Sequence, residues 1–486
     1  MSNQILSLKP EAVWRNFHSL TQIPRPSKKE TRIIEFMKQF GEKLGLETIV
    51  DHVGNVIIKK PATPGMENRK GVILQSHLDM VPQKNNDKVH DFEKDPIETV
   101  LDGEWVRANG TTLGADNGIG VAAIMSVLEA KDLVHGPVEA LFTIDEETGM
   151  TGAQHLKPGL LNGDILINLD SEDEGELYVG CAGGIDGTFT FKFNKQKPAN
   201  NHVALKVNVT GLKGGHSGMD IVLGKGNSCK IVTRLVWHGV THHKLQLSYI
   251  EAGNMRNAIP REGHALVTVP ADEKQKFIEC TEKLGKKIKD ELSMVEPGLQ
   301  ITVTEAPMPE YLIDTDTQNR LLRAVYGCPN GVMRMSDAMV GLVETSTNLS
   351  IIETNTDSVV VKCLLRSSVN SAKKDLSTMM GSIFELAGAE VVFEGEYPGW
   401  KPNPDSPILK TMQHVYNNTF GKVPEIKAIH AGLECGLLGA VYPNWDMISF
   451  GPTIRSPHSP DEKVNIASIN KFWTYLVETL KNIPVK

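Results

Sequence analysis

Short apolar runs separated by polar loops dominate the first third of the chain. The runs 71–74, 138–144 and 165–169 have the length and composition of buried strands. The segment 118–130, between the first two runs, is long enough to form a helix. Because helices and buried strands alternate, this pattern predicts an α/β fold with a mostly parallel sheet and helices on both faces.

The two ends of the chain continue this pattern. Near the N-terminus the spacing predicts a helical region over 11–44, broken at Pro24 and Pro26, followed by strands over 46–51 and 55–59. Near the C-terminus it predicts a helix over 407–420, a strand over 447–450 and a helix over 466–480. The closing segment is too short to fold as a domain alone, so we expect it to complete the N-terminal sheet.

The middle of the chain has a different pattern. Residues 189–193 and 203–209 alternate apolar and polar side chains, which is typical of antiparallel strands with one solvated face. Strands and helices then follow in two rounds, through helices over 273–292 and 371–386, without a sequence repeat. We therefore predict a discontinuous domain of residues 1–183 and 399–486, with an α+β lid domain of residues 184–398 inserted in it.

Composition limits the classes of function. The chain has 486 residues, of which 40% are hydrophobic and 23% charged, and its formal charge is −8, as in ordinary globular proteins. The excess of acidic over basic residues argues against a nucleic-acid partner. The N-terminus lacks a signal peptide and the longest apolar stretch, 121–128, is too short to span a membrane. We expect a cytoplasmic protein with no membrane partner.

The six cysteines occur singly, without a Cys-x-x-Cys pair. Neither a disulfide framework nor a zinc finger is indicated, and most of these thiols should be buried.

Candidate chemistry begins where the run 71–74 leads into His77 and Asp79. Side chains two residues apart on a strand point to one face, so a carboxylate could fix the ring of a metal-binding histidine. Alone, the pair is more typical of a surface hydrogen bond. Asp116, between glycines at the start of the predicted helix 118–130, would alone be interpreted as an N-cap.

Further acids and a histidine follow other predicted strands. Glu146 and Glu147 come after 138–144, Asp170 ends the next strand, and His458 lies in a loop between two prolines. Two histidines and several carboxylates at strand ends form a mixed nitrogen and oxygen site suited to zinc, cobalt or manganese. Five ligands exceed the needs of one hydrolytic zinc, and they fit two ions about 3.5–4 Å apart with a bridging carboxylate.

These motifs resemble those of the dinuclear zinc aminoacylase and carboxypeptidase family of metallopeptidases. The resemblance is carried by His77-Leu78-Asp79, Gly114-Ala115-Asp116-Asn117, Asp145 to Gly149, Asn168-Leu169-Asp170, Gly214 to Gly218 and Ser456-Pro457-His458. More narrowly, Gly253 to Pro260 and His430 to Gly436 are similar to segments of the dipeptidases in that family. The match extends from the first helix to the last and implies a zinc-exopeptidase-like fold.

The resemblance implies a role for each site residue. It implies that two Zn²⁺ ions bind per chain, for which Co²⁺ or Mn²⁺ can substitute. The implied metal ligands are His77 and Asp170 for one ion, Glu147 and His458 for the other, and Asp116 as the bridge. Asp79 would orient His77, and Glu146 would act as general base. A cis peptide is implied between Asp116 and Asn117.

The resemblance also implies an activity. It is that of a dipeptidase which cleaves unblocked dipeptides, including Xaa-His substrates such as carnosine, through attack by a metal-bridging hydroxide. In the lid domain, His216 would stabilise the oxyanion, and Asn257 and Arg366 would bind the substrate. The chain is expected to form a homodimer. The alternatives are an acyl-amino-acid amidohydrolase with the same metals and a non-catalytic scaffold that retains a relict site.

Overall fold

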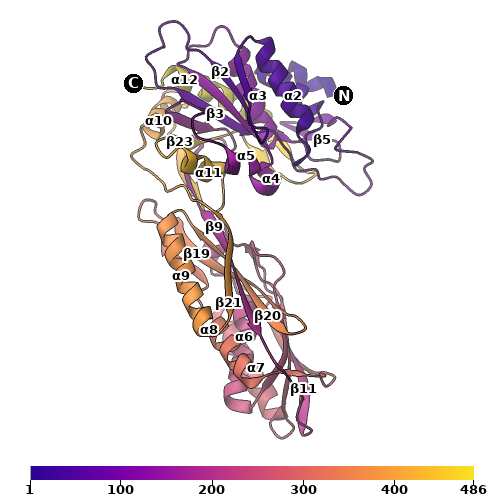
Figure 1. Cartoon of the computed structure of the whole chain (residues 1–486). Coiled ribbons are helices and arrows are strands. Elements are labelled where there is room, and N and C mark those ends of the chain that lie inside the picture. Colours follow the sequence, from indigo (N-terminus) through magenta and orange to yellow (C-terminus); the bar gives the residue numbers. More distant parts are fainter. Residues whose placement is uncertain (1) are drawn as a thin grey trace. The chain divides into compact units, whose positions relative to one another are not determined.

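The computed structural model describes residues 2–486, which divide into two compact units (Figure 1). Unit 1 consists of residues 2–180, 402–428 and 433–486, and unit 2 of residues 181–401 and 429–432. Residues 181–183, 399–401 and Ile429–Gly432 therefore belong to unit 2, although the sequence pattern places all three segments in the first domain.

Unit 1 is built on a sheet of eight strands. Their order is β1 (Glu47–Val50), β2 (Val56–Lys60), β6 (Val138–Thr143), β3 (Val72–His77), β7 (Ile165–Asn168), β23 (Asp446–Ser449), β8 (Glu176–Cys181) and β22 (Glu425–Ile429). The four strands β6, β3, β7 and β23 are parallel to one another. The pairings of β1 with β2, β2 with β6 and β23 with β8 are antiparallel. The predicted α/β class is confirmed, and these four parallel strands form one continuous block of the sheet.

Two groups of helices pack around this sheet, as Figure 1 shows. One group comprises α1 (Glu11–Thr21), α2 (Thr31–Lys43) and α3 (Ala115–Glu129), and the other includes α10 (Pro407–Phe420) and α12 (Ile466–Lys481). Both faces of α3 are buried, because the helix lies between α1 and β3. The interruption of the helical region that was predicted at Pro24 and Pro26 lies between α1 and α2.

A smaller sheet and several short elements complete unit 1. The sheet has the order β24 (Ile454–Arg455), β25 (Lys463–Asn465), β5 (Trp105–Ala108) and β4 (Thr99–Asp102). The short helices are η1 (Ser2–Ser7), α4 (Glu146–Gly149), α5 (Thr151–His155) and α11 (Glu434–Val441). The pairing of β24 with β25 closes the loop that carries His458.

Unit 2 contains an antiparallel sheet of nine strands. Its main path is β16 (Gln300–Glu305), β11 (His202–Thr210), β15 (Gly263–Pro270), β13 (Gln246–Ala252), β19 (Val343–Thr354), β20 (Ser358–Ser367), β9 (Gly183–Lys192) and β21 (Glu390–Tyr397), and β18 (Gly331–Met335) pairs with β19. Two further two-stranded sheets pair β10 (Lys195–Gln196) with β17 (Leu312–Ile313) and β12 (Gly215–His216) with β14 (Ala258–Ile259). The antiparallel pattern predicted for this region is correct.

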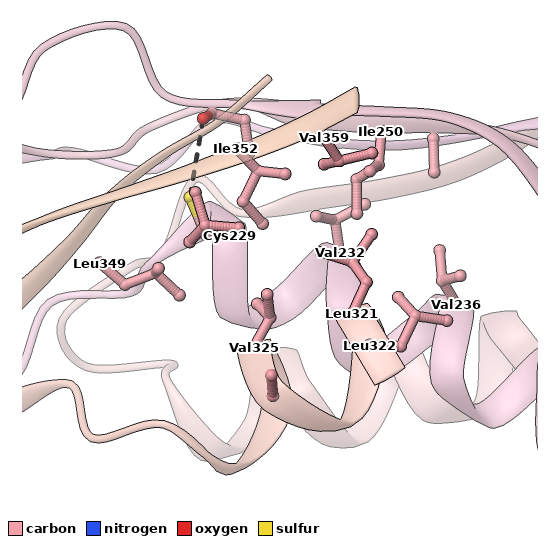
Figure 2. Packing of buried hydrophobic residues seen from close by; sticks show 14 of the residues in the cluster. Cys229, Val232, Val236, Ile250, Leu321, Leu322, Val325, Leu349, Ile352 and Val359 are labelled. Atoms are coloured by element: carbon pink, nitrogen blue, oxygen red, sulfur yellow. Dashed lines mark hydrogen bonds between the residues drawn. The ribbon is translucent and has the colours of Figure 1, made fainter. Parts of the chain in front are cut away.

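Helices pack along the nine-stranded sheet and enclose a second core. They are α6 (Ser228–His243), α7 (Lys274–Glu291), α8 (Thr315–Gly327) and α9 (Asn370–Leu386), with the short helix η2 (Ile221–Leu223) near β18 and β19. Figure 2 shows Cys229, Val232 and Val236 of α6 and Leu321, Leu322 and Val325 of α8 packed with strand residues that include Ile250, Ile352 and Val359. The six cysteines remain thiols, and five of them are buried, as predicted.

The sequence pattern did not predict α6 or α8. The sequence of α6 contains many β-branched residues, which lower intrinsic helix propensity. In the structure the Asn227 side chain accepts a hydrogen bond from the Lys230 N–H and caps the helix. Burial of one face of α6 in the core outweighs the weak propensity.

Candidate metal centre and active site

The parallel strands of unit 1 bring the predicted ligands to one edge of the sheet. His77 ends β3 and lies opposite Thr143, which ends β6. Glu146 and Glu147 follow β6 within a few residues, and Asp170 follows β7. Because carboxyl ends of parallel strands share an edge, residues distant in sequence converge there.

Asp116 stands between two groups of potential ligands. One group is His77, Asp116 and Asp170, and the other is Asp116, Glu147 and His458; within each, the ligand atoms lie within 4.8 Å of one another. His77 Nε2 is 3.2 Å from Asp116 Oδ1, and His458 Nε2 is 3.2 Å from Asp116 Oδ2. The two oxygens of one carboxylate therefore face two different histidines, which is the arrangement of a bridging ligand. The Asp116-Asn117 peptide is cis.

The spacing of these atoms fits two metal ions. Ligands about 2.0–2.1 Å from a tetrahedral zinc lie roughly 3.3 Å from each other. His77 Nε2 is 3.4 Å from Asp170 Oδ1, and His458 Nε2 is 2.8 Å from Glu147 Oε2. Glu147 Oε1 and Asp170 Oδ1 are buried and have no hydrogen-bond partner among the described residues. Buried carboxylate oxygens without donors are suited to a cation.

The electrostatics of the site also favour positive charge. Hydrogen bonds to Asp116 and Glu147 raise the pKa of His458 to about 11, against the effect of burial. Burial opposes protonation of His77, but the nearby Asp170 and Asp116 carboxylates raise its pKa well above the ordinary value. Burial raises the pKa of Asp170 to about 7. The clustered carboxylates thus favour the protonated forms of the neighbouring groups. This is expected of a site that binds cations.

Asp79 connects the first histidine to the two glutamates. Its Oδ1 lies 3.3 Å from His77 Nδ1 and accepts the Glu146 N–H at 3.0 Å, while Oδ2 accepts the Glu147 N–H at 3.2 Å. Ser27 donates its hydroxyl to Oδ2 at 2.8 Å. Burial opposes ionisation of Asp79, but these contacts lower its pKa to about 2. The carboxylate therefore stays ionised beside His77.

Glu146 is placed among the same groups. An oxygen of its carboxylate lies within 4.8 Å of ligand atoms of His77 and Glu147. Burial raises the pKa of Glu146 well above the ordinary value of a glutamate. A buried carboxyl with a raised pKa can take up a proton and release it again, as a general base must.

Two supporting residues were not predicted from the sequence. The buried Glu462 carboxylate accepts backbone N–H groups from the four residues Leu113 to Asp116, at 2.7–3.2 Å. The buried Arg25 guanidinium donates to the carbonyls of Leu78 and Asp79, both at 2.9 Å, and also to Gly114. Together they fix the chain at Asp79 and Asp116. The sequence offers no local signal, because both residues lie far from the segments that they hold.

A third group of acids is satisfied without a metal. Glu30, Asp79 and Asp145 also lie within 4.8 Å of one another and are buried. Glu30 accepts the backbone N–H groups of Lys28 and Asp145, and Asp145 accepts the hydroxyls of Thr148 and Thr151. Because protein donors engage these carboxylates, the group is a structural hydrogen-bond network.

The remaining predicted residues lie together in unit 2. The Gly215–His216 strand pairs with Ala258–Ile259, and the Ser217 N–H donates to the Asn257 carbonyl at 2.9 Å. The turn before His216 needs positive φ values, 65° at Gly214 and 151° at Gly215, which glycine adopts readily. Burial, together with the positive charge of Arg366, lowers the pKa of the His216 ring.

Arg366 is buried in β20 and only partly satisfied. Its Nη1 donates to the Tyr397 hydroxyl at 2.9 Å, while Nε has no hydrogen-bond partner among residues 2–486. His430 is also buried in unit 2, and no role was predicted for it from the sequence. Its Nε2 lies 2.7 Å from Ser346 Oγ. Burial and the charge of Arg366 lower the pKa of His430 to about 3.

Comparisons with known proteins agree with this geometry. Residues 73–482 match the profile of Peptidase family M20/M25/M40. The chain is 44% identical over 484 residues to the cytosol non-specific dipeptidase of Escherichia coli (strain K12), with 100% of both chains covered. The crystal structure of the aminoacylhistidine dipeptidase from Vibrio alginolyticus has a TM-score of 0.96 and 48% identity, again over 100% of both chains.

More distant structures share the fold alone. The aminopeptidase PepT from Bacillus cereus has a TM-score of 0.58 at 15% identity and covers 98% of this chain and 99% of its own. None of the helices in residues 2–486 has the length and apolarity needed to cross a membrane.

The fold and the clustered acids and histidines thus define an enzyme, and the chain belongs to Peptidase family M20/M25/M40. Within this family of metal-dependent peptidases, it is similar along its whole length to the two dipeptidases named above.

Proposed function

We propose that this protein is a metal-dependent dipeptidase that hydrolyses unblocked dipeptides, including Xaa-His substrates such as carnosine. The observation that carries the proposal is the Asp116 carboxylate, whose two oxygens face His77 and His458 separately. The full-length similarity to two dipeptidases supports the choice of substrate class. The name of the Escherichia coli relative also supports a cytoplasmic location.

The residues of unit 1 would hold two metal ions, with zinc as the proposed metal. His77 and Asp170 would bind one ion, Glu147 and His458 the other, and Asp116 both. When bound, such ions lower the pKa of coordinated water and polarise the scissile carbonyl. Asp79 would hold the His77 ring in one orientation through its ionised carboxylate.

Glu146 would move the proton during hydrolysis. Its carboxylate would accept a proton from the attacking water and deliver it to the nitrogen of the leaving amino acid. Glu147 cannot share this task if it binds a metal, so the two adjacent glutamates would have separate roles. The raised pKa of Glu146 supports its role as proton carrier.

The residues of unit 2 would act on the substrate. We assign His216 to stabilising the oxyanion, Asn257 to substrate binding and Arg366 to the terminal carboxylate of the dipeptide. The unpartnered Nε of Arg366 supports its assignment, because a buried guanidinium with a free donor can bind a carboxylate bidentately. Formation of a homodimer remains part of the proposal.

A dipeptide panel on protein of defined metal content tests the function. The purified chain, loaded with zinc and assayed for metal content, should bind two ions and hydrolyse glycyl-leucine and carnosine. N-acetyl amino acids serve as the comparison, because an acyl-amino-acid amidohydrolase with the same metals would prefer them. Preference for the N-acetyl substrates would contradict the proposal. Two bound metals with no hydrolysis of any peptide would also contradict it.

A further inference from the structure

Glu434 is a buried carboxylate beside the metal ligands that the proposed mechanism does not use. It is the first residue of α11 and only 1% exposed. Its Oε2 accepts hydrogen bonds from Gln75 Nε2 at 2.6 Å and Thr143 Oγ1 at 2.8 Å. The other oxygen, Oε1, is buried and has no hydrogen-bond partner among the described residues.

The two donors place this carboxylate at the edge of the sheet where the ligands converge. Gln75 precedes His77 by two residues on β3, and Thr143 lies opposite His77 in the parallel register. Thr143 also precedes Glu146 by three residues. Glu434 nevertheless belongs to neither of the ligand groups that share Asp116. It is therefore fixed beside the candidate reaction site, with one buried oxygen that accepts no hydrogen bond from the described residues.

A buried carboxylate normally has a cationic partner or a full set of donors. Among residues 2–486, Glu434 forms no ion pair with a lysine or an arginine, and only Oε2 has donors. Beyond Gln75 the network continues through neutral groups, because Asn168 donates to Gln75 Oε1 and the Ser449 hydroxyl donates to Asn168 Oδ1. Within the described part of the chain, Oε1 of Glu434 thus accepts no hydrogen bond, and no lysine or arginine pairs with the carboxylate.

We propose that Glu434 binds the free α-ammonium group of the substrate through Oε1. This inference rests on the proposed function, since an unblocked dipeptide carries that ammonium next to the scissile carbonyl. The ammonium would supply the charge and the donors that Oε1 lacks. It follows that Glu434 distinguishes peptides with a free N-terminus from N-acyl amino acids, whose acyl group has no charge.

A matched pair of substrates tests this role. Alanyl-leucine and propionyl-leucine differ only in the ammonium group, so their kcat/KM ratio measures how strongly the enzyme recognises that group. For the zinc-loaded wild type we expect a strong preference for alanyl-leucine. Glu434→Gln retains the size of the side chain and removes its charge. We expect it to lower kcat/KM for alanyl-leucine on the order of 10²-fold, as for loss of one partner of a buried ion pair, and to leave propionyl-leucine within about threefold.

Two further variants separate recognition from structural damage. Glu434→Asp keeps the negative charge on a side chain that is one methylene shorter. It should therefore retain part of the preference for alanyl-leucine over propionyl-leucine. Glu139→Gln is the matched control, because Glu139 is a buried acid that accepts the N–H groups of Asn162 and Gly163 at the other end of β6. It should leave the substrate ratio unchanged. Thermal midpoints and metal content are measured for every variant.

Binding provides a readout that does not depend on turnover. In a Glu146→Gln background, calorimetry should give a Kd for alanyl-leucine that rises on the order of 10²-fold when Glu434→Gln is added, with little change for propionyl-leucine. An equal loss for both ligands would show that Glu434 has only a structural role and would overturn the inference. A wild type that does not hydrolyse alanyl-leucine at all would instead contradict the proposed function.

Discussion

His77 Nδ1 lies 3.3 Å from Asp79 Oδ1, while the opposite ring nitrogen, Nε2, faces Asp116 and Asp170. The ring is thus held from one side by an ionised carboxylate and presents its other nitrogen to the candidate metal. The same carboxylate accepts the backbone N–H groups of Glu146 and Glu147. One aspartate therefore sets the positions of a proposed ligand and of the start of α4, which carries the proposed base.

Asp79→Ala should weaken metal binding without removing a ligand. Loss of the carboxylate frees the His77 ring and the first turn of α4 at Glu146, and changes of this kind typically cost roughly 10–100-fold in metal affinity or activity. Competition with a chelator measures the affinity, and Asp79→Asn, which keeps the shape of the side chain, serves as its control. If zinc affinity and rate both remain at the wild-type level in Asp79→Ala, the orienting role is wrong.

Neighbouring substitutions at Glu146 and Glu147 should have different effects. Glu146→Ala should lower kcat by at least about 10²-fold, the usual scale for loss of a general base, and retain both metals. Glu147→Ala should lose metal, since it removes a proposed ligand. Metal analysis of the two purified variants, together with their kcat values, checks the assignment. Loss of metal from Glu146→Ala would mean that the two roles have been assigned incorrectly.

Much of unit 1 could be predicted because its pattern is local. Apolar strands such as β6 and β7 are buried on both faces, and helix α10 begins and ends at the predicted residues Pro407 and Phe420. His77, Glu147 and Asp170 could be found because they end or follow such strands, and the full set of five because its motifs resemble those of a known family. The structure brings five proposed ligands together, with their ring nitrogens and carboxylate oxygens near one another.

The features that could not be predicted depend on contacts between distant segments. Glu462 holds residues about 350 positions earlier in the chain, and Glu434 meets Gln75 across a similar separation. Helix α6 forms despite weak propensity, because a core that is assembled from many segments buries it. Periodicity carries no information about such contacts, so the supporting residues and α6 emerge only in three dimensions.

Glu462→Gln should destabilise the turn that carries Asp116. The amide can accept fewer of the four N–H groups, and it places a donor against them. Each buried group left unsatisfied costs about 1–3 kcal/mol, so the thermal midpoint should fall and metal affinity should fall with it. Calorimetry on metal-free and metal-loaded protein separates the two effects. Wild-type stability in the metal-free variant would show that Glu462 does not hold this turn.

Arg366→Ala should mainly harm substrates with a free terminal carboxylate. Loss of a charge-assisted pair to a carboxylate should raise KM for glycyl-leucine by roughly 10–100-fold and leave glycyl-leucinamide nearly unchanged. Arg366→Lys keeps the charge without the planar fork and should be intermediate. The comparison of peptide with amide is the measurement. An equal loss on both substrates would assign Arg366 to the structure of unit 2 alone.

His430 should make unit 2 less stable as the pH falls. Its ring is buried against Ser346, near the positive charge of Arg366, and its pKa is lowered from 6.5 to about 3. In the unfolded chain the ring gains a proton below about pH 6.5, whereas in the folded protein it does not until about pH 3. The stabilising contribution of neutral His430 is therefore complete above pH 6.5 and is lost progressively between pH 6.5 and pH 3.

The size of this effect follows from linkage, and His430→Gln isolates it. One unit of pKa difference corresponds to about 1.4 kcal/mol, so between pH 6.5 and pH 5 the wild type should lose about 2 kcal/mol more stability than the variant. Glutamine can still reach the Ser346 hydroxyl but does not titrate. Urea unfolding at both pH values measures the difference in the free energy of unfolding. Both proteins are used without metal, so that titration of the metal ligands of unit 1 contributes equally to each. If the two proteins lose stability in parallel, His430 is already protonated in the folded state, and the lowered pKa is wrong.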